Sequence, residues 1–283
     1  MKNELLNDDK KGGVIITITS GKGGVGKSTT SANIATGIAL EGKKTLVIDF
    51  DIGLRNLDMI LGLEKRVVYN VIDVMEGKQP LNKAIITTKN IPNLYFLPAS
   101  QSQDKDVLNK EKVIKLFEEL KHKFDYIIVD SPAGIEDGFF YSILMADIAL
   151  IVANPEVSSI RDADRAIGLI DAKSHKSDLE EPEEVLKYLI VNRIKPEMVE
   201  KGEMLNSAEM KEILAIDMIG LVPDDDKVIQ STNYGTPIVI MDPKNNVSIA
   251  YRNIAKRLVG QDVPFMEIKK VSKFRKILNS LKG

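Results

Sequence analysis

Cysteine is absent from this chain of 283 residues. Without thiols the protein has no disulfides, no thiolate metal site and no cysteine-held iron–sulfur cluster. Long apolar runs are absent too, because no stretch approaches the roughly 20 apolar residues of a transmembrane helix. Residues 1–11 are charged and have no apolar core, so we expect no secretory signal there. We find no internal repeat or low-complexity tract, and these absences together predict a soluble cytoplasmic protein.

A basic surplus is also missing from most of the chain. The formal net charge is −2, and residues 265–283 carry six Lys or Arg against one Glu, which is +5. The other 264 residues therefore hold 33 basic and 40 acidic side chains, which is −7. Such an acidic body is a poor candidate for broad nucleic-acid binding. The basic C-terminal segment needs a separate explanation.

Short apolar runs alternate with helical patterns along the chain. Most runs lack strict apolar–polar alternation, which is typical of strands in a parallel sheet covered on both faces. This order predicts a doubly wound α/β domain with a site at the carboxyl ends of its strands. The predicted strands are 14–19, 44–50, 94–98, 125–130, 148–153, 188–192 and 218–222. The predicted helices are 29–41, 109–121, 138–146, 159–172, 207–214 and 247–258, and 173–184 is expected to be an exposed loop.

A glycine-rich loop follows the first predicted strand and precedes a helical pattern. Its G-x-x-x-x-G-K-[ST] spacing in this context is typical of a phosphate-binding loop, whose backbone N–H groups and helix N-terminus hold phosphate oxygens. Lys27 would reach the β- and γ-phosphates, and the Ser28 hydroxyl would ligate Mg²⁺. An ordinary glycine turn is the alternative. The predicted ATP-binding residues of the loop are Gly21, Lys22, Gly23, Gly24, Val25, Gly26, Lys27, Ser28 and Thr29.

The second residue of the loop, Lys22, is a cation that a plain nucleotide site does not require. Its long side chain leaves the loop near the γ-phosphate. We expect it to neutralise phosphate charge on a neighbouring subunit, as an arginine finger does. A solvated surface lysine is the alternative. Lys22 and Lys27 are therefore both predicted to act in catalysis.

Acidic residues follow two of the predicted strands. Asp49 and Asp51 end one strand, and Asp130 ends another after four apolar residues. Strand-end carboxylates of this kind lie on the Mg²⁺ side of a phosphate site and act through a coordinated water. We predict Ser28, Asp51 and Asp130 at the metal, with Asp51 orienting the attacking water. Gly134 is predicted to offer a backbone N–H near the γ-phosphate, as a switch loop does; helix capping is the alternative for Asp130.

The loop sequence resembles the deviant Walker A ATPases, also called the ParA/MinD family. Other segments resemble the septum-positioning members of this family, and the similarity covers nearly the whole chain from Val14 to the last helix. The absence of cysteine excludes the branch of the nitrogenase iron protein. The segments that carry the resemblance are 47–58, 66–70, 97–101, 130–136 and 154–162.

The resemblance implies roles for several of these residues. It implies a sandwich homodimer formed with ATP, in which Lys22 acts across the interface. Asp49 and Asp51 would belong to a first switch and Asp130 to a second. Asn192 and the backbone around Pro223 would hold the adenine, a task that suits the donor and the acceptor of an amide. A turn residue at a strand end is the alternative for Asn192.

Residues 156–165 form a charged segment that is predicted to lie on a helix beside the dimer seam. By resemblance, a MinE-like activator and a MinC-like inhibitor would compete for this surface. The residues predicted to bind them are Arg161, Asp162 and Asp164. A solvated, self-paired charged face is the alternative.

The basic C-terminal segment has the pattern of an amphipathic helix. At about 100° per residue, its apolar side chains fall within an arc of about 120°. Such a short helix suits the surface of an anionic membrane, and two tethered copies bind far more tightly than one. Docking on the protein's own surface is the alternative. The predicted membrane-binding residues are Val271, Phe274, Arg275, Ile277, Leu278 and Leu281.

We therefore expect a disordered extension over 1–13, a P-loop ATPase domain over 14–260, a linker over 261–268 and a membrane-targeting helix over 269–283. The expected function is an Mg²⁺-dependent ATPase switch that is peripheral on the cytoplasmic face of the inner membrane and positions the division septum. Its partners would be a second copy, the inhibitor, the activator and anionic lipid, with no specific nucleic acid. A flagellar-number ATPase of the FlhG type and a DNA-partition ATPase of the ParA type are the alternatives.

Overall fold

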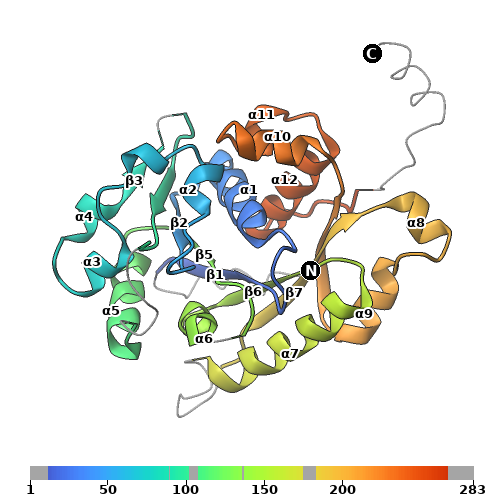
Figure 1. Cartoon of the computed structure of the whole chain (residues 1–283), viewed down its shortest axis with the longest axis horizontal. Coiled ribbons are helices and arrows are strands. Elements are labelled where there is room, and N and C mark those ends of the chain that lie inside the picture. The colour runs from blue at the N-terminus through green and yellow to red at the C-terminus, as the bar shows by residue number, and fades with distance from the viewer. Residues whose placement is uncertain (1–11, 89, 102–107, 136, 175–182, 267–283) are drawn as a thin grey trace.

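The computed structural model describes residues 12–88, 90–101, 108–135, 137–174 and 183–266. Within them an eight-stranded sheet runs through the molecule with helices on both faces (Figure 1). The strands are β1 (Val14–Thr19), β2 (Thr45–Asp49), β3 (Ile86–Thr87), β4 (Leu94–Leu97), β5 (Tyr126–Asp130), β6 (Ile148–Ala153), β7 (Leu186–Ile194) and β8 (Asp217–Pro223). The longer helices are α1 (Lys27–Leu40), α5 (Lys110–Lys121), α7 (Val157–Lys173), α9 (Ser207–Leu214) and α12 (Asn246–Leu258).

The strand order is β3-β4-β2-β5-β1-β6-β7-β8, and all neighbours are parallel except β3 and β4. In Figure 1, α1, α10, α11 and α12 cover one face of the sheet, and α5, α6, α7 and α9 lie on the other. The central strands β2, β5 and β6 are buried along their whole length because their residues are apolar toward both faces. This confirms the predicted doubly wound fold, which places a site outside the carboxyl ends of the central strands.

Shorter helical segments were not predicted, apart from the one after β5. Helices of four or five residues are fixed by caps and tertiary contacts, so apolar periodicity does not mark them. The helix after β5 ends at Ile143, three residues before the predicted end. These segments are α2 (Leu57–Ile60), η1 (Glu64–Arg66), α3 (Val71–Met75), α4 (Leu81–Ala84), α6 (Asp137–Ile143), α8 (Pro196–Glu200), α10 (Lys227–Asn233) and α11 (Ile238–Met241).

Two ends of the described chain bear on the predicted domain limits. The N–H of Gly13 donates to the carbonyl of Lys121 at 2.8 Å, so this residue of the predicted extension is bonded to the body. Residues 1–11 and the whole predicted membrane helix, 269–283, lie outside the described residues. The predicted membrane-binding side chains therefore have no structural description.

Candidate functional site

The phosphate loop joins β1 to α1 and is packed too tightly for side chains at two of its glycines. Gly26 has a φ of +97°, a left-handed conformation that favours glycine. A Cβ on Gly26 would lie 2.5 Å from Nδ2 of Asn192, and one on Gly21 would lie 1.8 Å from the backbone oxygen of Asp162. The loop is therefore wedged between β7 and α7. Glycine is required here for packing as well as for the expected approach of phosphate.

Lys27 is the first residue of α1, and only 7% of it is exposed. Burial lowers the pKa of Lys27, whereas the negative charges of Asp130 and Asp51 act to raise it. A buried ammonium at a helix N-terminus, with carboxylates beside it, forms a charged centre that suits an anionic ligand and its metal ion. This is the position that the loop motif predicted for the phosphate-binding lysine.

Asp49 and Asp130 end neighbouring strands and face each other in the register of β2 and β5. Each is only 1% exposed. Asp49 accepts hydrogen bonds from the backbone N–H groups of Asp51 and Leu57, at 3.0 and 3.3 Å. Burial raises the pKa of Asp49 well above its ordinary value, and the nearby charge of Asp130 raises it further. Asp49 therefore fixes the start of the loop that follows β2.

Burial also raises the pKa of Asp130, to about 6, although hydrogen bonds from Ser28 and Ser31 and the charge of Lys27 act to lower it. The Ser31 hydroxyl donates to Oδ1 of Asp130 at 2.8 Å. Sequence reasoning missed Ser31 because the loop motif ends at Ser28. Its spacing of three residues along α1, on the same helix face, was the available signal.

Asp51 and Gly134 lie in the loops that follow β2 and β5. Asp51 is half-buried, and its charge acts on both Lys27 and Asp130. Gly134 has a φ of +82°, and no atom lies within 4 Å of the place where its Cβ would stand. We call Lys27, Asp49, Asp51 and Asp130 the charge cluster. The structure brings these predicted residues together, while their catalytic and metal roles remain predictions.

The chemistry of the charge cluster fits Mg²⁺ that arrives with a nucleotide. Across the described ranges, no three acidic or histidine side chains converge into a self-sufficient metal site. The hydroxyl of Ser28, at the start of α1, hydrogen-bonds to the carboxylate of Asp130. Hydroxyl and carboxylate oxygens are hard ligands of the kind that Mg²⁺ prefers. Phosphate oxygens and water would have to complete the coordination, as is usual for nucleotide-bound Mg²⁺.

Lys22 leaves the same loop in another direction. Its Nζ lies 3.2 Å from the hydroxyl of Ser158 and 3.6 Å from Oε2 of Glu156, and 42% of its side chain is exposed. Both partners are at the start of α7. The two lysines of the loop therefore have different surroundings, and Lys22 lies at the surface beside α7.

Asn192 and Pro223, the residues predicted to hold adenine, lie near the ends of β7 and β8. Asn192 is 5% exposed, and its Nδ2 donates to the carbonyl of Val25 at 2.7 Å. The amide thus supports the phosphate loop, a contact that the sequence did not indicate. The predicted adenine contact remains a prediction.

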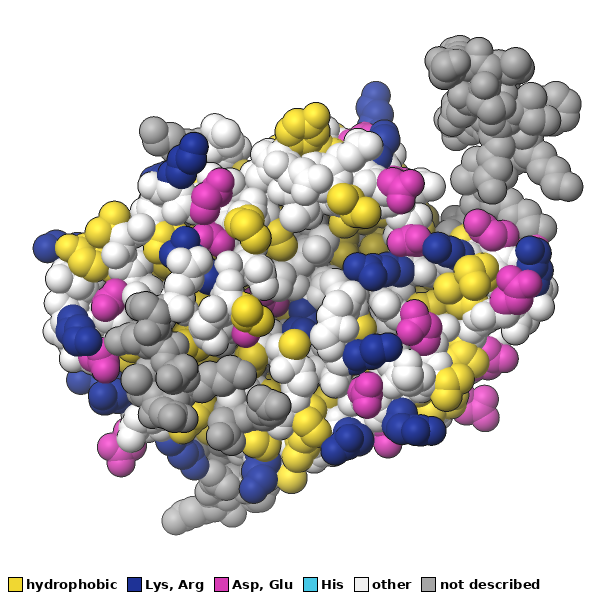
Figure 2. All heavy atoms as spheres, in the orientation of Figure 1, with side chains coloured by type: hydrophobic (Ala, Val, Ile, Leu, Met, Phe, Trp, Pro, Cys, Tyr) yellow, Lys and Arg dark blue, Asp and Glu magenta, His cyan; other side chains and the backbone are white. Residues whose placement is uncertain are grey.

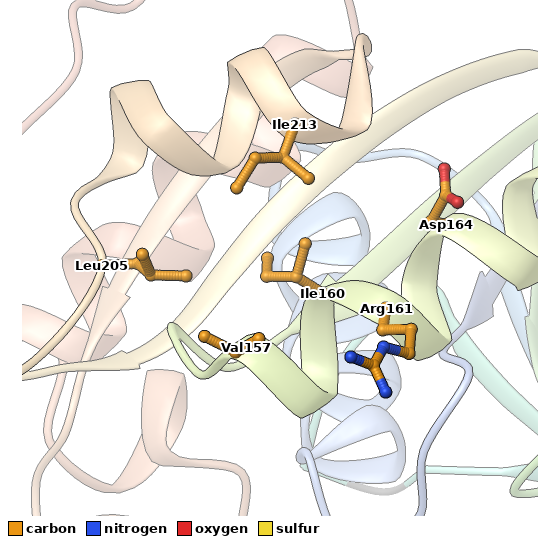
Figure 3. Close-up of a pocket in the computed structure, with 6 residues that line it drawn as sticks. All are labelled: Val157, Ile160, Arg161, Asp164, Leu205 and Ile213. Carbon is orange, nitrogen blue, oxygen red and sulfur yellow. The ribbon is translucent and has the colours of Figure 1, made fainter.

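The predicted partner residues share one helix. Arg161 and Asp164 are exposed on α7, and Asp162 is half-buried against the phosphate loop. None of the three pairs with an opposite charge among the described residues, in contrast to the self-paired alternative. Beside them lies a pocket of about 260 Å³ between α7 and α9 (Figure 3). Its lining residues are Val157, Ile160, Arg161, Asp164, Leu205 and Ile213.

We call Arg161, Asp162, Asp164 and this pocket the α7 face. In Figure 3 the side chains of Val157, Ile160, Leu205 and Ile213 converge and Arg161 lies beside them, whereas Asp164 stands farther along α7 with its carboxylate pointing away. Val157 and Ile213 are 67% and 54% exposed. The α7 face thus combines an open apolar hollow with charges on one rim, a composition typical of a protein-binding surface.

No helix formed by the described residues combines the length and the apolar character that crossing a membrane demands.

Comparisons with known proteins place this fold and loop in a defined class. The family model ParA, described as NUBPL iron-transfer P-loop NTPase, matches residues 13–259. The septum site-determining protein MinD of Helicobacter pylori is 53% identical over 270 residues, which cover 95% of this chain and 98% of that protein. MinD of Escherichia coli K12 is 48% identical, with 92% of this chain and 96% of that protein covered.

Solved structures agree with this placement. The chain matches the MinC:MinD cell division complex of Aquifex aeolicus with a TM-score of 0.80 and 50% identity, covering 90% of this chain and 98% of that one. It matches MinD of Pyrococcus horikoshii, complexed with Mg-ADP, with a TM-score of 0.75 and 26% identity, covering 87% and 96%. Fold and phosphate loop thus define a P-loop ATPase of the deviant Walker A class.

Within that class the sequence identity is more specific. The chain belongs to the MinD family of septum site-determining ATPases.

Proposed function

We propose that this ATPase is a dimerisation switch, which pairs with a second copy when it holds ATP and then binds the membrane. The observation that carries the proposal is the separation of two lysines from one loop. Lys27 is buried in the charge cluster, whereas Lys22 is at the surface beside α7. One internal cation and one outward cation suit a phosphate shared between two chains.

Nucleotide binding would use the residues that the structure gathers at the carboxyl ends of β1, β2 and β5. Backbone N–H groups of the loop and the Lys27 ammonium would hold phosphate, with Ser28 and Asp130 on the Mg²⁺ side. The Mg-ADP complex of the Pyrococcus horikoshii relative supports this use of nucleotide with magnesium. Asp51, half-buried beside Lys27, is the candidate for orienting the attacking water. Asn192 would keep the loop in place during turnover.

The α7 face is the proposed surface for an inhibitor of the MinC kind and an activator of the MinE kind. The complex of MinC with MinD from Aquifex aeolicus supports a partner of the first kind. The charges of Arg161 and Asp164, which have no ion-pair partner among the described residues, would give specificity, and the pocket would take an apolar side chain of the partner. Because Lys22 contacts the start of α7, a partner bound there would lie next to the proposed catalytic lysine. An activator at this place would trigger hydrolysis and release from the membrane.

The proposed tail, residues 269–283, would bring the protein to the cytoplasmic face of the inner membrane. Each Lys or Arg close to anionic lipid contributes on the order of 1 kcal/mol. A helix of about a dozen residues is marginal in water, so ordering it offsets much of that gain. One tail therefore binds weakly and a dimer binds tightly, which makes membrane attachment depend on ATP.

The surface of the body argues against DNA as a partner. On the face drawn in Figure 2, Lys and Arg side chains of the described residues are interspersed with Asp and Glu. Residues 1–264 have a net charge of −7. A DNA-partition role would require a continuous basic surface on the body.

Sedimentation with anionic phospholipid vesicles tests the proposal. We expect the full chain to pellet with vesicles in ATP·Mg²⁺ and to stay in the supernatant in ADP·Mg²⁺ or without nucleotide. Phe274→Asp should still form the ATP dimer but stay in the supernatant, since an aspartate on the apolar arc is repelled by anionic lipid. Equal pelleting in ATP and ADP would show that nucleotide does not control attachment.

Charge reversal tests the partner surface separately. Asp164→Lys should weaken binding to the purified MinC-like protein and leave basal ATPase activity unchanged, because Asp164 is exposed and lies outside the charge cluster. Glu118→Lys, an exposed position on α5, is the matched control. Equal affinities of the wild type and Asp164→Lys for this partner would show that the charged face is only solvated and does not bind it.

A further inference from the structure

Residues 259–266, which we call the strap, follow α12 and lead toward the predicted membrane tail. Gly260 has a φ of +84° and turns the chain out of the helix. The sequence predicted a linker over 261–268. The structure bonds this segment to the body as far as it is described. Val259 and Met266 pack against the core, and one side chain of α12 makes two hydrogen bonds and a ring contact to the strap.

That side chain is Arg257, in the last turn of α12, which is only 5% exposed. Its Nε donates to the carbonyl of Val263 at 3.0 Å and its Nη2 to that of Pro264 at 2.8 Å. Its Nη1 donates to the carbonyl of Ile219 at 2.8 Å, in the edge strand β8. The guanidinium also lies 4.2 Å from the centre of the Phe265 ring. One planar group thus fastens the strap to the sheet.

This contact set requires arginine. The guanidinium offers donors in a fixed planar fork and a flat face for stacking, whereas a lysine ammonium concentrates its three donors on one atom. A lysine at position 257 would keep the positive charge but lose the geometry that holds three carbonyls and a ring. Arg257→Lys therefore separates the effect of the positive charge from the effect of the hydrogen bonds and the ring contact.

The strap also contacts the helix that begins at the phosphate loop. Nε2 of Gln261 donates to Oε2 of Glu41, the residue directly after α1, at 2.9 Å. α12 packs closely on α1, since a Cβ on Gly37 would lie 2.7 Å from the Cβ of Ala255. The point at which the chain leaves the body is thus fixed relative to the helix of the nucleotide site.

We propose that Arg257 is a positioning residue for membrane attachment, which fixes the point where each tail leaves the body. The proposal rests on the proposed membrane function. With the strap fastened, the tether before the apolar arc at Val271 is residues 267–270; with the strap released, it is residues 259–270. The effective concentration of the second tail falls roughly as the −3/2 power of tether length. Releasing the strap should therefore weaken vesicle binding of the ATP dimer by about fivefold.

A spin label tests the fastening itself. Because the chain has no cysteine, Glu267→Cys gives a single labelling site directly after the strap. We expect a restricted label in the otherwise wild-type chain and a mobile one in Arg257→Met and Arg257→Lys. Arg252→Met, on the same helix and half-buried, is the matched control and should leave the label restricted. A label as restricted in Arg257→Met as in the wild type would overturn the proposal.

Vesicle binding in ATP·Mg²⁺ tests the consequence. Arg257→Met and Arg257→Lys should both bind about fivefold more weakly, with unchanged ATP affinity, and Arg252→Met should bind as the wild type does. Full rescue by lysine would overturn the proposal in favour of charge alone. Phe265→Ser removes only the ring contact and should give intermediate mobility and binding, so the test stands even if Arg257→Met fails to fold. If the wild-type chain did not bind vesicles, the membrane function would be refuted as well. Equal binding of the wild type and Arg257→Met would refute only the role of Arg257.

Discussion

The charge cluster and the α7 face differ in how many of their charged groups find partners within a single chain. In the cluster, two carboxylates are 1% exposed and Lys27 is 7% exposed, and backbone N–H groups and serine hydroxyls bond to the carboxylates. On the α7 face, Arg161 and Asp164 have no ion-pair partner among the described residues, and the apolar pocket is open. The first region is assembled within one chain, whereas the second needs another molecule to complete it.

Lys22 belongs to the phosphate loop but contacts the start of α7, so it links these two regions. Its pair with Glu156, at 3.6 Å, joins side chains that are 42% and 55% exposed. Exposed pairs of this kind contribute about 0 to 1 kcal/mol, so Lys22 can leave α7 at little cost. The phosphate loop thus holds one lysine firmly and the other loosely. Mutating each lysine separately tests whether the two have different roles.

The largest effect should come from Lys22→Ala, measured on partner-stimulated hydrolysis. A cation that acts across a dimer is worth roughly a thousandfold or more in turnover. We expect such a loss together with loss of the ATP dimer in light scattering. Affinity for ATP in titration calorimetry should stay within about twofold, because Lys22 is not part of the charge cluster.

Two outcomes would contradict a role for Lys22 across the dimer interface. Normal dimer formation and normal stimulated turnover in Lys22→Ala would show that Lys22 is a surface residue whose only role is its contact with α7. Lys43→Ala, at an exposed position after α1, is the control for removal of one positive charge.

Lys27→Ala should act on binding instead, with a loss of about a hundredfold in ATP·Mg²⁺ affinity. Hydrogen bonds to charged groups contribute about 1.5 to 3 kcal/mol, and this one would also leave buried carboxylates without their cation. Calorimetric titration measures the loss directly. Unchanged affinity would show that Lys27 does not bind phosphate. Together, the two lysine variants distinguish ATP binding from action across the dimer interface.

How much of this was visible in the sequence depends on the range of the interactions. The loop motif and the strand-end positions of Asp49 and Asp130 are local signals, and the structure places them as predicted. The helix predicted over 109–121 begins one residue later, because the Asn109 side chain caps it. The support of the loop by Asn192 joins residues 167 positions apart, and the Arg257 bond to Ile219 spans 38. Such contacts leave no periodic trace, so only the folded chain shows them.

An effect of about the same size should appear in the pH dependence of stability without nucleotide. Because the pKa of Asp130 rises to about 6 in the folded state, the folded chain holds this proton more tightly than the unfolded chain does. The stabilisation is fully present below about pH 4 and is lost as pH rises through about 6. Two pKa units correspond to about 3 kcal/mol.

Chemical unfolding of wild type and Asp130→Asn between pH 4 and 8 measures this. The stability of the wild type relative to the variant should fall by about 3 kcal/mol over that range. Burial raises the pKa of Asp49 too, but Asp49 is present in both chains, so its contribution largely cancels in this comparison. Asp164→Asn, on the exposed α7 face, is the control. Parallel profiles for the wild type and Asp130→Asn would show that the buried carboxyl carries no such linkage.

The smallest effect should come from Asn192→Ala, and it decides between two roles of one amide. Loss of the bond to the Val25 carbonyl should cost about 1 kcal/mol, or about fivefold in affinity. If Asn192 supports the loop, affinities for ATP and for base-free tripolyphosphate, both with Mg²⁺, should fall by the same factor. Asn233→Ala, at the end of α10, is the control. A loss confined to ATP would instead establish Asn192 as the adenine contact, and the loop would then be held by its packing against α7 alone.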